Sequence, residues 1–309
     1  MTTLLVAATG GHLAQLYQLR PRLVVPGSPV VWVTFDSPQS RSMLEQEVVE
    51  FVPYTPPRGY WSVVTNTFRA IRILRRYRVR RVISTGSGIA LAFLPIARAM
   101  GRDAHYIESA ARSDGPSTTG RMLQRFPGIK LSAQYSSWAK PPWNLNVSVF
   151  DDFQAVQRAE PRGDVRSVVV TLGTIEGYGF RSLLERLVEI IPEGVEVLWQ
   201  TGVTDVSGLA LTARPSMPQH ELQAAIATSD AVVAHAGIGS ALGSLNAGRR
   251  PVLVPRRSSR GEHVDDHQLQ IAKELDGRDL SISREVDELM WADIEEAARW
   301  HVSRSSVTQ

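Results

Sequence analysis

The chain contains no cysteine among its 309 residues. That absence excludes a disulfide framework, a thiol nucleophile and a zinc site built from thiolates. No uninterrupted apolar stretch approaches twenty residues, and no basic leader precedes the first expected strand, Thr3 to Ala8. We therefore expect neither a transmembrane helix nor a signal peptide, and a cytoplasmic location is compatible with both expectations.

The nucleotide-binding fingerprint of dehydrogenases is also missing. No Gly-x-Gly-x-x-Gly follows an expected strand with an acidic residue about twenty positions later, which argues against NAD-dependent redox chemistry. The length exceeds that of one ordinary domain. It fits two domains of about 150 residues, each large enough to bury its own core.

Charge is distributed unevenly along the chain. Residues 1–150 carry 18 Lys or Arg against 7 Asp or Glu, a net charge of +11, whereas residues 151–309 carry 16 against 24, a net charge of −8. Ten arginines and no acidic residue lie between Glu50 and Asp103. Within this region, arginines alternate with apolar positions, which is typical of a helix lying on an anionic membrane. The apolar side of that helix is expected to contain Phe68, Ile71, Leu74 and Tyr77.

Two other interpretations of the basic stretch remain. An amphipathic helix packed on its own sheet would leave the arginines in water. A basic stripe also suits nucleic acid, but no recognised nucleic-acid motif accompanies it, so no nucleic-acid partner is expected.

Apolar runs alternate with helical patterns throughout both halves of the chain. This alternation predicts an α/β architecture with parallel, doubly wound sheets. We expect one domain over residues 1–150, a linker within residues 150–165 and a second domain over residues 165–309. A closing helix is expected from Val286 to about His301. In open parallel sheets ligands bind beyond the carboxyl ends of the strands, so the cleft between the domains is the expected place for the chemistry.

A buried strand, a glycine turn and a helix follow one another in the second half. The strand is expected over Ala231 to Ala234, the turn contains Gly237 and Gly239, and the helix runs from Ser240 to Ala247. Glycine lets backbone N–H groups approach a ligand, and the first turn of a helix offers unpaired N–H donors and a positive dipole end. The segment therefore favours a bound diphosphate, with a strand-to-helix turn that binds nothing as the alternative.

This segment and the polar loop after it resemble the donor domain of GT-B glycosyltransferases. The resemblance is carried by His235-Ala-Gly-Ile-Gly-Ser240, Asn246-Ala-Gly-Arg-Arg-Pro-Val-Leu-Val-Pro255 and Asp266-His-Gln-Leu-Gln-Ile-Ala272. The most similar groups are the donor subunit of the two-subunit, dolichol-linked N-acetylglucosaminyltransferase and the bacterial transferase that makes lipid II. The resemblance implies a GT-B fold, with two Rossmann-like domains facing a cleft, and a single chain that joins an acceptor domain to a donor domain.

In the first domain, Thr9-Gly10-Gly11-His12 is similar to the loop that faces the acceptor in these enzymes. Because an unperturbed imidazole has a pKa of about 6.5, His12 is the candidate general base for an acceptor hydroxyl. The alternative is a histidine that caps the helix or contacts the diphosphate. A second turn, Ser84-Thr-Gly86-Ser87-Gly88, also follows a strand and resembles the acceptor domain, and we expect it to hold a lipid-linked phosphate.

The stretch from Tyr106 to Arg121 is similar to the acceptor subunit of the dolichol-linked enzyme and to its bacterial exopolysaccharide relatives. Glu108 and Arg112 are expected to contact the acceptor or to order the site, and Glu108 is the second candidate for the base. A buried structural pair of Glu108 and Arg112 is the alternative. The expected acceptor-binding residues are Gly10, Gly11, Gly86, Ser87, Arg112 and Ser117.

Donor contacts are expected at strand ends and in polar loops of the second domain. Gln200 and Met217 are placed to form the floor and rim for a nucleobase, whereas Trp199 fits a core position at least as well. In the loop from Pro255 to Gln268, Arg or His side chains would neutralise charge on the leaving diphosphate. The expected donor-binding residues are Gly173, Thr174, Gln200, Met217, His235, Gly237, Gly239, Ser240, Arg256, Glu262, His263, Asp266 and Gln268.

The same loop contains side chains that metals use. A site built from His263, Asp265, Asp266 and His267 is an alternative, but their spacing fits no familiar ligand pattern. Transfer in the GT-B group needs no metal ligand set. We therefore expect no metal and no cofactor, since the UDP-sugar is a substrate.

Gly243 departs from the family pattern. A glutamate that grips the nucleotide ribose commonly occupies this position, so ribose recognition must differ here. The residues able to substitute are Glu262, Asp265 and Asp266.

An arginine cluster in the donor loop bears on the sugar. Arg256, Arg257 and Arg260 suggest an acidic sugar such as glucuronate, because a guanidinium can hold a carboxylate by two hydrogen bonds.

The resemblance implies an inverting transfer from a UDP-sugar, carrying GlcNAc or glucuronic acid, to a polyprenyl-diphosphate-linked saccharide in cell-surface polysaccharide synthesis. The expected partners are the UDP-sugar, the lipid-linked acceptor and an anionic membrane surface, with the protein peripheral on the inner face of the cell membrane. Two alternatives remain: a non-hydrolysing UDP-sugar epimerase, and a non-catalytic binding or scaffold protein.

Overall fold

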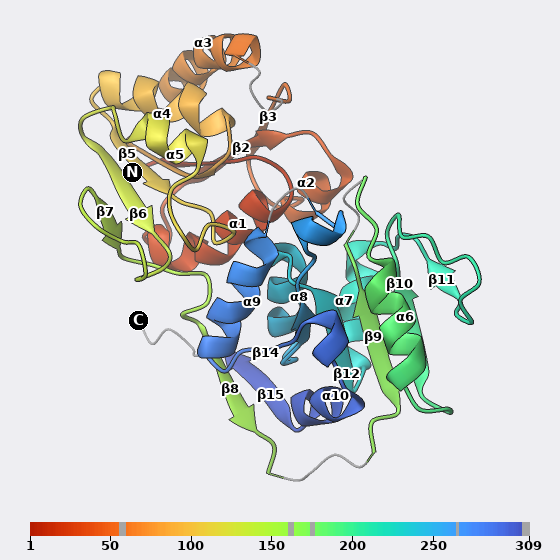
Figure 1. Cartoon of the computed structure of the whole chain (residues 1–309). Coiled ribbons are helices and arrows are strands. Elements are labelled where there is room, and N and C mark those ends of the chain that lie inside the picture. The colour runs from red at the N-terminus through yellow and green to blue at the C-terminus, as the bar shows by residue number, and fades with distance from the viewer. Residues whose placement is uncertain (56–59, 160–163, 174–176, 264–265, 305–309) are drawn as a thin grey trace. The chain divides into compact units, whose positions relative to one another are not determined.

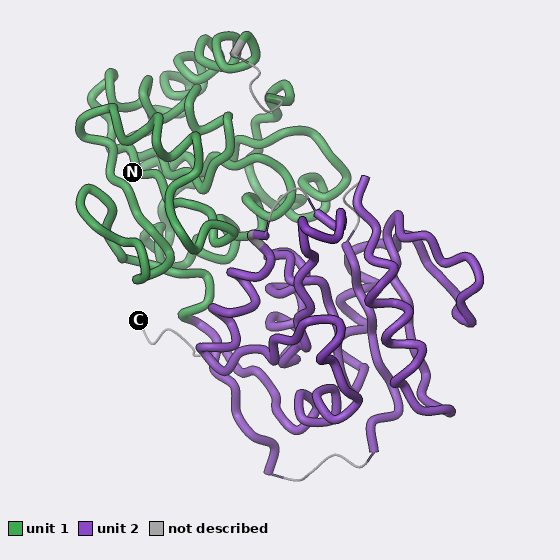
Figure 2. The backbone as a smooth tube through the Cα atoms, in the orientation of Figure 1, with its two compact units in different colours: residues 1–151 green, residues 152–309 purple. Residues whose placement is uncertain are grey.

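The computed structural model describes residues 1–55, 60–159, 164–173, 177–263 and 266–304. The chain divides into two compact units, residues 1–151 and residues 152–309 (Figure 2). Each unit is built around a parallel sheet, as the alternation of strands and helices predicted. Two of the sequence expectations, Thr174 and Asp265, lie outside the described residues.

The sheet of the first unit has the strand order β3-β2-β1-β4-β5-β6-β7, and every neighbouring pair is parallel (Figure 1). Its strands are β1 (Thr3–Ala7), β2 (Val30–Phe35), β3 (Val49–Val52), β4 (Arg81–Gly86), β5 (Asp103–Ile107), β6 (Ile129–Ala133) and β7 (Trp143–Leu145). Its helices are α1 (Gly11–Leu23), α2 (Pro38–Met43), α3 (Tyr60–Arg76), α4 (Ile89–Ala99) and α5 (Thr118–Leu123). Because β1 lies in the centre and reverses the strand order, the carboxyl ends of β1 and β4 lie side by side.

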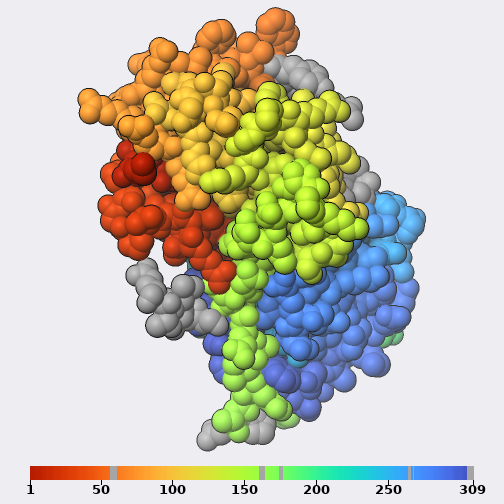
Figure 3. Space-filling model, turned by 90° about the vertical axis from the view of Figure 1, so that its left-hand side faces the viewer, coloured from red at the N-terminus to blue at the C-terminus, as the bar shows by residue number. Residues whose placement is uncertain are grey.

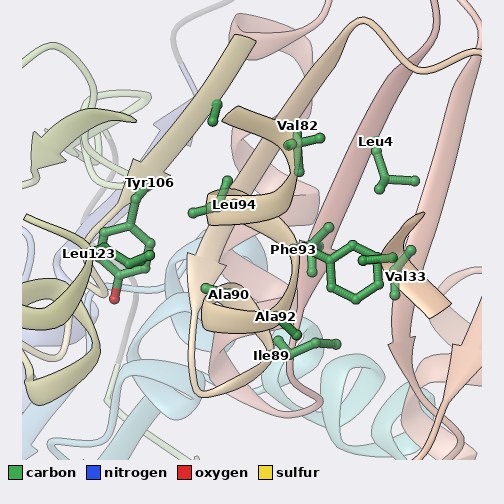
Figure 4. Packing of buried hydrophobic residues seen from close by; sticks show 14 of the residues in the cluster. Leu4, Val33, Val82, Ile89, Ala90, Ala92, Phe93, Leu94, Tyr106 and Leu123 are labelled. Carbon is green, nitrogen blue, oxygen red and sulfur yellow. The ribbon is translucent and has the colours of Figure 1, made fainter. Parts of the chain in front are cut away.

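Apolar side chains of the central strands and of α4 form the core of this unit. Figure 4 shows Phe93 of α4 beside Leu4 and Val33 of the sheet, and Leu94 on the side of Tyr106. All five are essentially inaccessible to solvent. Parallel strands covered on both faces need such continuous apolar runs, and β1 is buried at every position.

The outer face of α3 differs from the face that was expected to meet a membrane. Leu74 packs in the core with no exposed surface, so the prediction that it faces outward is wrong. Trp61 is 84% exposed and Phe68 is 70% exposed, and α3 lies on the surface of its unit (Figure 3). The helical period turns the inward positions toward α4 and the core, which the interleaved arginines had obscured.

The second unit has a sheet of order β11-β10-β9-β12-β13-β14, again with parallel neighbours (Figure 1). Its strands are β9 (Ser167–Thr171), β10 (Glu196–Gln200), β11 (Ala213–Arg214), β12 (Ala231–His235), β13 (Val252–Val254) and β14 (Ile282–Ser283). Its helices are α6 (Arg181–Ile190), α7 (Gln219–Thr228), α8 (Ile238–Asn246), α9 (His267–Gly277) and α10 (Trp291–Ala298), with 3-10 turns at Ser258–Arg260 and Val286–Glu288.

The first and last strands of this unit pair with each other. The unit begins at residue 152, inside the range expected for the linker, and β8 (Phe153–Gln157) in that range pairs antiparallel with β15 (Trp300–Arg304). The expected closing helix from Val286 to His301 is instead a 3-10 turn, α10 and the start of β15. The expected helix is wrong at its end because β15 satisfies its backbone groups on β8, across about 140 residues of sequence, a pairing that local patterns do not record.

Candidate active site

The three acceptor-side motifs of the first unit meet at the carboxyl edge of its sheet. Gly10 and His12 follow β1, Gly86 ends β4, and Glu108 follows β5. Ala7 pairs with Gly86, and the N–H of Ala8 donates to the carbonyl of Gly86 at 3.1 Å. The register of the central strands therefore brings the first two motifs side by side.

His12 is held by the neighbouring strand. Its Nδ1 lies 2.7 Å from the carbonyl oxygen of Thr85, and the Thr85 hydroxyl donates back to the His12 carbonyl at 2.8 Å. Because a carbonyl only accepts, Nδ1 carries the proton and Nε2 keeps its lone pair. Burial lowers the pKa of His12 below its usual value, against the opposing effects of the Thr85 carbonyl and of Glu108. The imidazole is therefore neutral at neutral pH and able to accept a proton at Nε2.

The glycines around His12 are required by geometry. Gly10 has φ +84°, and its N–H donates to Oε1 of Gln39 at 2.7 Å. Gly86 has φ +103°, and a Cβ there would lie 3.1 Å from Cε1 of His12 and 3.3 Å from the Tyr106 hydroxyl. A side chain at Gly86 would be strained by the positive φ and would push on the imidazole, so this glycine lets the His12 ring approach the β4 turn closely.

Glu108 closes the loop that follows β5. Its buried carboxylate accepts from the Tyr106 hydroxyl and from the N–H of Ser109, both at 3.1 Å. The other oxygen accepts from the N–H of Ser117 at 2.9 Å and from its hydroxyl at 3.0 Å. Both oxygens of Glu108 are thus engaged within the loop, and Glu108 holds the start of the loop to Ser117.

The remaining acceptor-side residues surround this loop and the β4 turn. Ser117 caps α5, accepting from the N–H of Gly120 at 3.1 Å. Arg112 is half-buried in the loop, and its carbonyl accepts from the Trp138 indole at 3.0 Å. Ser87 is half-buried at the start of α4, and Gly11 is the first residue of α1. The structure thus gathers the predicted acceptor residues at one sheet edge.

In the second unit, His235 ends β12 and is buried against two glycines. A Cβ at Gly173 would lie 2.6 Å from its Cε1, and a Cβ at Gly237 would lie 2.3 Å from its Nε2. Its Nδ1 lies 3.3 Å from the Thr171 carbonyl and 3.4 Å from the Ser240 hydroxyl. Burial, aided by the nearby Arg256 charge, lowers the pKa of His235 to about 3, so the ring is neutral.

The helix that follows His235 begins without a side-chain cap. Gly237 is the N-cap residue of α8, and as a glycine it provides no side-chain hydrogen bond to the first N–H groups of the helix. Gly239 is exposed, and a Cβ there would meet nothing within 4 Å. The turn therefore leaves room and donors for an anion at the positive end of α8.

Gln200 and Met217 have different surroundings. Gln200 is buried; its Oε1 accepts from the Thr171 hydroxyl at 2.7 Å, and its Nε2 donates to the carbonyls of Gly173 and Pro215. Gln200 therefore fixes the loop at Gly173 rather than offering a free amide. Met217 is half-buried just before α7, and Trp199 packs in the core.

The three arginines of the donor loop are not equivalent. Arg257 lies 3.6 Å from Glu285, and Arg260 lies 2.8 Å from Asp287. Arg256 is only 1% exposed, and its Nη2 donates to the carbonyl of Leu172 at 2.7 Å.

Arg256 forms no ion pair within the described part of the chain, and its Nε and Nη1 are buried without a hydrogen-bond partner there. Burial lowers the pKa of Arg256 to about 10, partly offset by Glu262, so the guanidinium remains charged. A buried cation without an acidic partner is costly, which makes Arg256 the strongest anion-binding candidate in this loop.

Other loop residues fix its shape. Glu262 accepts from the Ser182 hydroxyl at 2.6 Å and from the N–H of Arg257 at 3.0 Å. Gln268 is buried and accepts from the N–H of Arg256 at 3.1 Å. Asp266 accepts from the N–H and hydroxyl of Ser258. The carboxylates of Glu262 and Asp266 therefore accept hydrogen bonds from the loop itself, Asp266 through Oδ1.

His263 was expected to bind the donor, and Gly243 occupies the position of the ribose-binding glutamate. In the structure the ring of His263 packs against Tyr178, with centroids 5.6 Å apart. A Cβ at Gly243 would lie 2.8 Å from Nε2 of Gln223, which α7 places over α8. In the described residues no three His, Asp or Glu side chains are grouped as a metal would require.

Sequence reasoning assigned no role to the side chains of Tyr106, Gln15 and Gln134, which contact residues 108–110 in the structure. The Tyr106 hydroxyl donates to the carboxylate of Glu108. A signal existed for Gln15, because it occupies the inward face of α1 beside Leu16 and Leu19, where an apolar residue is normal.

Comparison with known proteins agrees with this geometry. Residues 168–296 match the glycosyltransferase family 28 C-terminal domain. The protein is a glycosyltransferase of the GT-B fold, which confirms the predicted fold and enzyme class.

The chain is similar to the UDP-N-acetylglucosamine–N-acetylmuramyl-(pentapeptide) pyrophosphoryl-undecaprenol N-acetylglucosamine transferase of Xylella fastidiosa, with 26% identity over 88% of this chain and 79% of the relative. Among solved structures it resembles MurG of Acinetobacter baumannii, with a TM-score of 0.61, 18% identity and coverage of 97% of this chain and 89% of that chain. It also resembles the Streptomyces glycosyltransferase SsfS6 complexed with thymidine diphosphate, with a TM-score of 0.56, 17% identity and coverage of 97% and 90%.

Proposed function

We propose that the protein transfers a sugar from a UDP-sugar to a polyprenyl-diphosphate-linked saccharide, with inversion, in the synthesis of a cell-surface polysaccharide. The observation that carries this proposal is the orientation of His12, whose Nδ1–H is bound by the Thr85 carbonyl so that Nε2 is the atom left to accept a proton. Support for the substrate classes comes from the relative named above, which transfers N-acetylglucosamine to an undecaprenol-linked acceptor.

In the proposed reaction, an acceptor hydroxyl oxygen attacks the anomeric carbon from the face opposite the leaving group. The proton of that hydroxyl passes to Nε2 of His12. The bond between the anomeric carbon and the β-phosphate oxygen breaks, and UDP departs with the bonding electrons. The uncapped start of α8 stabilises the negative charge that develops on the diphosphate.

The donor is UDP-GlcNAc or UDP-glucuronate. The relative's N-acetylglucosamine supports the first. The buried cation Arg256 supports the second, because the other two arginines of the cluster already have acidic partners. Comparing the two donors in the Arg256 variant separates a carboxylate contact from a diphosphate contact.

The surface of α3 supports a place at the inner face of the membrane. Trp61, Val64 and Phe68 are exposed at helical spacing, and Arg69 and Arg72 continue the same exposed face. Aromatic side chains enter the interface while arginines contact anionic headgroups. No helix in the described ranges is long and apolar enough to cross a membrane.

The proposal is tested by measuring UDP release from UDP-GlcNAc, UDP-glucuronate and UDP-glucose, each with and without a polyprenyl-diphosphate-linked saccharide. Release that depends on the acceptor supports transfer. Release or epimer formation without any acceptor contradicts it and points to the epimerase, which the comparisons do not favour.

A further inference from the structure

Two fully buried glutamines connect three separate segments of the first unit. Gln15 and Gln134 have no exposed surface. Gln15 lies on α1, one turn after His12, and Gln134 follows β6. Burying an amide is unfavourable unless its hydrogen bonds are satisfied, and a leucine would fill the Gln15 position as well as its apolar neighbours do. The two amides therefore need an explanation other than packing.

The hydrogen bonds of Gln15 fix the orientation of its amide. Its Oε1 accepts from the N–H of Ala110 at 2.8 Å and from Nε2 of Gln134 at 3.1 Å. Its Nε2 donates to the Ser109 hydroxyl at 3.1 Å. Because a backbone N–H only donates, the oxygen of Gln15 must face Ala110, and the amide has one orientation.

Gln134 extends the connection in both directions. Its Nε2 also donates to the carbonyl of Glu108 at 2.8 Å, and its Oε1 accepts from the N–H of Val149 at 2.9 Å. The backbone of residues 108–110 is therefore held from two sides. The same residues begin the loop that Glu108 closes at Ser117.

We infer that Gln15 and Gln134 are positioning residues, which lock the loop of residues 108–117 to helix α1 and so set the acceptor against His12. This inference rests on the proposed function, in which His12 is the base and the loop contacts the acceptor. His12 and Gln15 share one rigid helix, so the Gln15 contacts fix the loop relative to the imidazole. A displacement of about 1 Å in such an arrangement can lower the rate roughly a hundredfold.

Gln18 supplies a matched control on the same helix. It is also buried, and its Nε2 donates to the carbonyl of Val149 at 2.6 Å. Its hydrogen bond to Val149 does not involve residues 108–117. Gln15→Met and Gln18→Met each replace a buried amide of α1 by an unbranched apolar side chain of similar volume, but only the first releases the loop.

The first readout is backbone hydrogen exchange of the full chain, followed by mass spectrometry of peptides covering residues 108–117. We expect Gln15→Met to accelerate exchange in this loop, with Gln18→Met matching the wild type there. Ser109→Ala, which removes one contact of Gln15, should give a smaller acceleration. Equal loop exchange in Gln15→Met and Gln18→Met overturns the lock.

The second readout is steady-state transfer to a lipid-linked acceptor. In Gln15→Met and Gln134→Met we expect kcat/KM for the acceptor to fall roughly ten- to a hundredfold, with KM for the donor unchanged. A looser loop with unchanged acceptor kinetics overturns the positioning role. Absence of transfer by the wild type contradicts the proposed function instead, and the exchange experiment distinguishes that outcome from failure of the lock.

Discussion

The Nδ1 atom of His12 lies 2.7 Å from the carbonyl oxygen of Thr85. This contact fixes the tautomer, and burial lowers the pKa of the ring. If neutral Nε2 is the base, activity is constant through neutral pH and falls only as the pH drops below the usual histidine range of about 6.5.

The His12 prediction is checked by pH profiles of kcat/KM for wild type and His12→Gln. We expect the variant to lose roughly 10²- to 10⁴-fold in rate and to lose the acid limb, while its affinity for UDP and its thermal midpoint change little. A variant that keeps the acid limb would show that another group is the base.

Buried neutral histidines make stability depend on pH. Burial lowers the pKa of His105 to about 4 and that of His235 to about 3, against about 6.5 in the unfolded chain. Between the folded and unfolded pKa values, the unfolded chain therefore binds more protons than the folded protein. The contribution of each ring to the free energy of unfolding is fully present above about pH 6.5. It declines as the pH falls toward 4 for His105 and toward 3 for His235, by up to about 1.4 kcal/mol per pH unit. Urea unfolding midpoints from pH 7.5 to 5 should fall less steeply in His105→Gln; an equal slope in both proteins contradicts this account.

Two glycines of the donor turn form a matched pair. Gly237→Ala places a Cβ 2.3 Å from Nε2 of His235, whereas Gly239→Ala meets no atom of the protein within 4 Å. We expect the first change to lower both the thermal midpoint and UDP affinity. The second should lower UDP affinity alone, because its methyl group meets no protein atom and lies in the first turn of α8, where we propose that the diphosphate binds. Calorimetric titration with UDP checks both expectations. If Gly239→Ala bound UDP with the affinity of the wild type, the proposal that the diphosphate binds at this turn would be contradicted.

The arginine prediction contrasts Arg256 with Arg260. Arg256→Met removes a buried charge that has no ion-pair partner among the described residues, so stability should hold or rise while UDP-sugar affinity falls about tenfold or more. Arg260→Met removes an exposed ion pair with Asp287 and should change little.

Calorimetric titration of wild type and Arg256→Met with UDP-glucuronate, UDP-GlcNAc and UDP measures this affinity and identifies the donor. A larger loss for UDP-glucuronate than for UDP-GlcNAc supports a carboxylate contact, and equal losses that extend to UDP support a diphosphate contact. Unchanged affinity for all three ligands contradicts an anion-binding role.

The membrane prediction concerns the exposed face of α3. Trp61→Ser combined with Phe68→Ser should weaken sedimentation with anionic vesicles and leave the fold intact, because both side chains are largely exposed. Val203→Ser, at an exposed apolar position of the second unit, is the control. Equal vesicle binding by the double variant and the control would assign the membrane contact elsewhere.

Much of the site followed from local patterns. A strand, a glycine turn and a helix recur at Gly10, Gly86 and Gly237, and a parallel sheet places the carboxyl ends of its strands at one edge. His12 belongs to the first of these turns. Its position at the sheet edge was therefore predictable without any knowledge of long-range contacts.

The missed features depend on residues far apart in sequence. Arg257 pairs with Glu285 and Arg260 pairs with Asp287. These ion pairs distinguish the two residues from Arg256, a difference that the sequence of the loop does not reveal. The Gln15 lock reaches Ala110 and Gln134 across about a hundred residues. The pairing of β8 with β15 has the same character, because propensity records only what neighbours in the chain prefer.

The most direct test of the account is the mass of a polyprenyl-diphosphate-linked saccharide after incubation with a UDP-sugar and either wild type or His12→Gln. We predict that wild type adds the mass of one sugar residue, with one UDP released per addition. His12→Gln should bind UDP and leave the acceptor almost unmodified. An acceptor that gains no sugar from any UDP-sugar with the wild type, or gains it equally with both proteins, would contradict transfer by a His12-based mechanism.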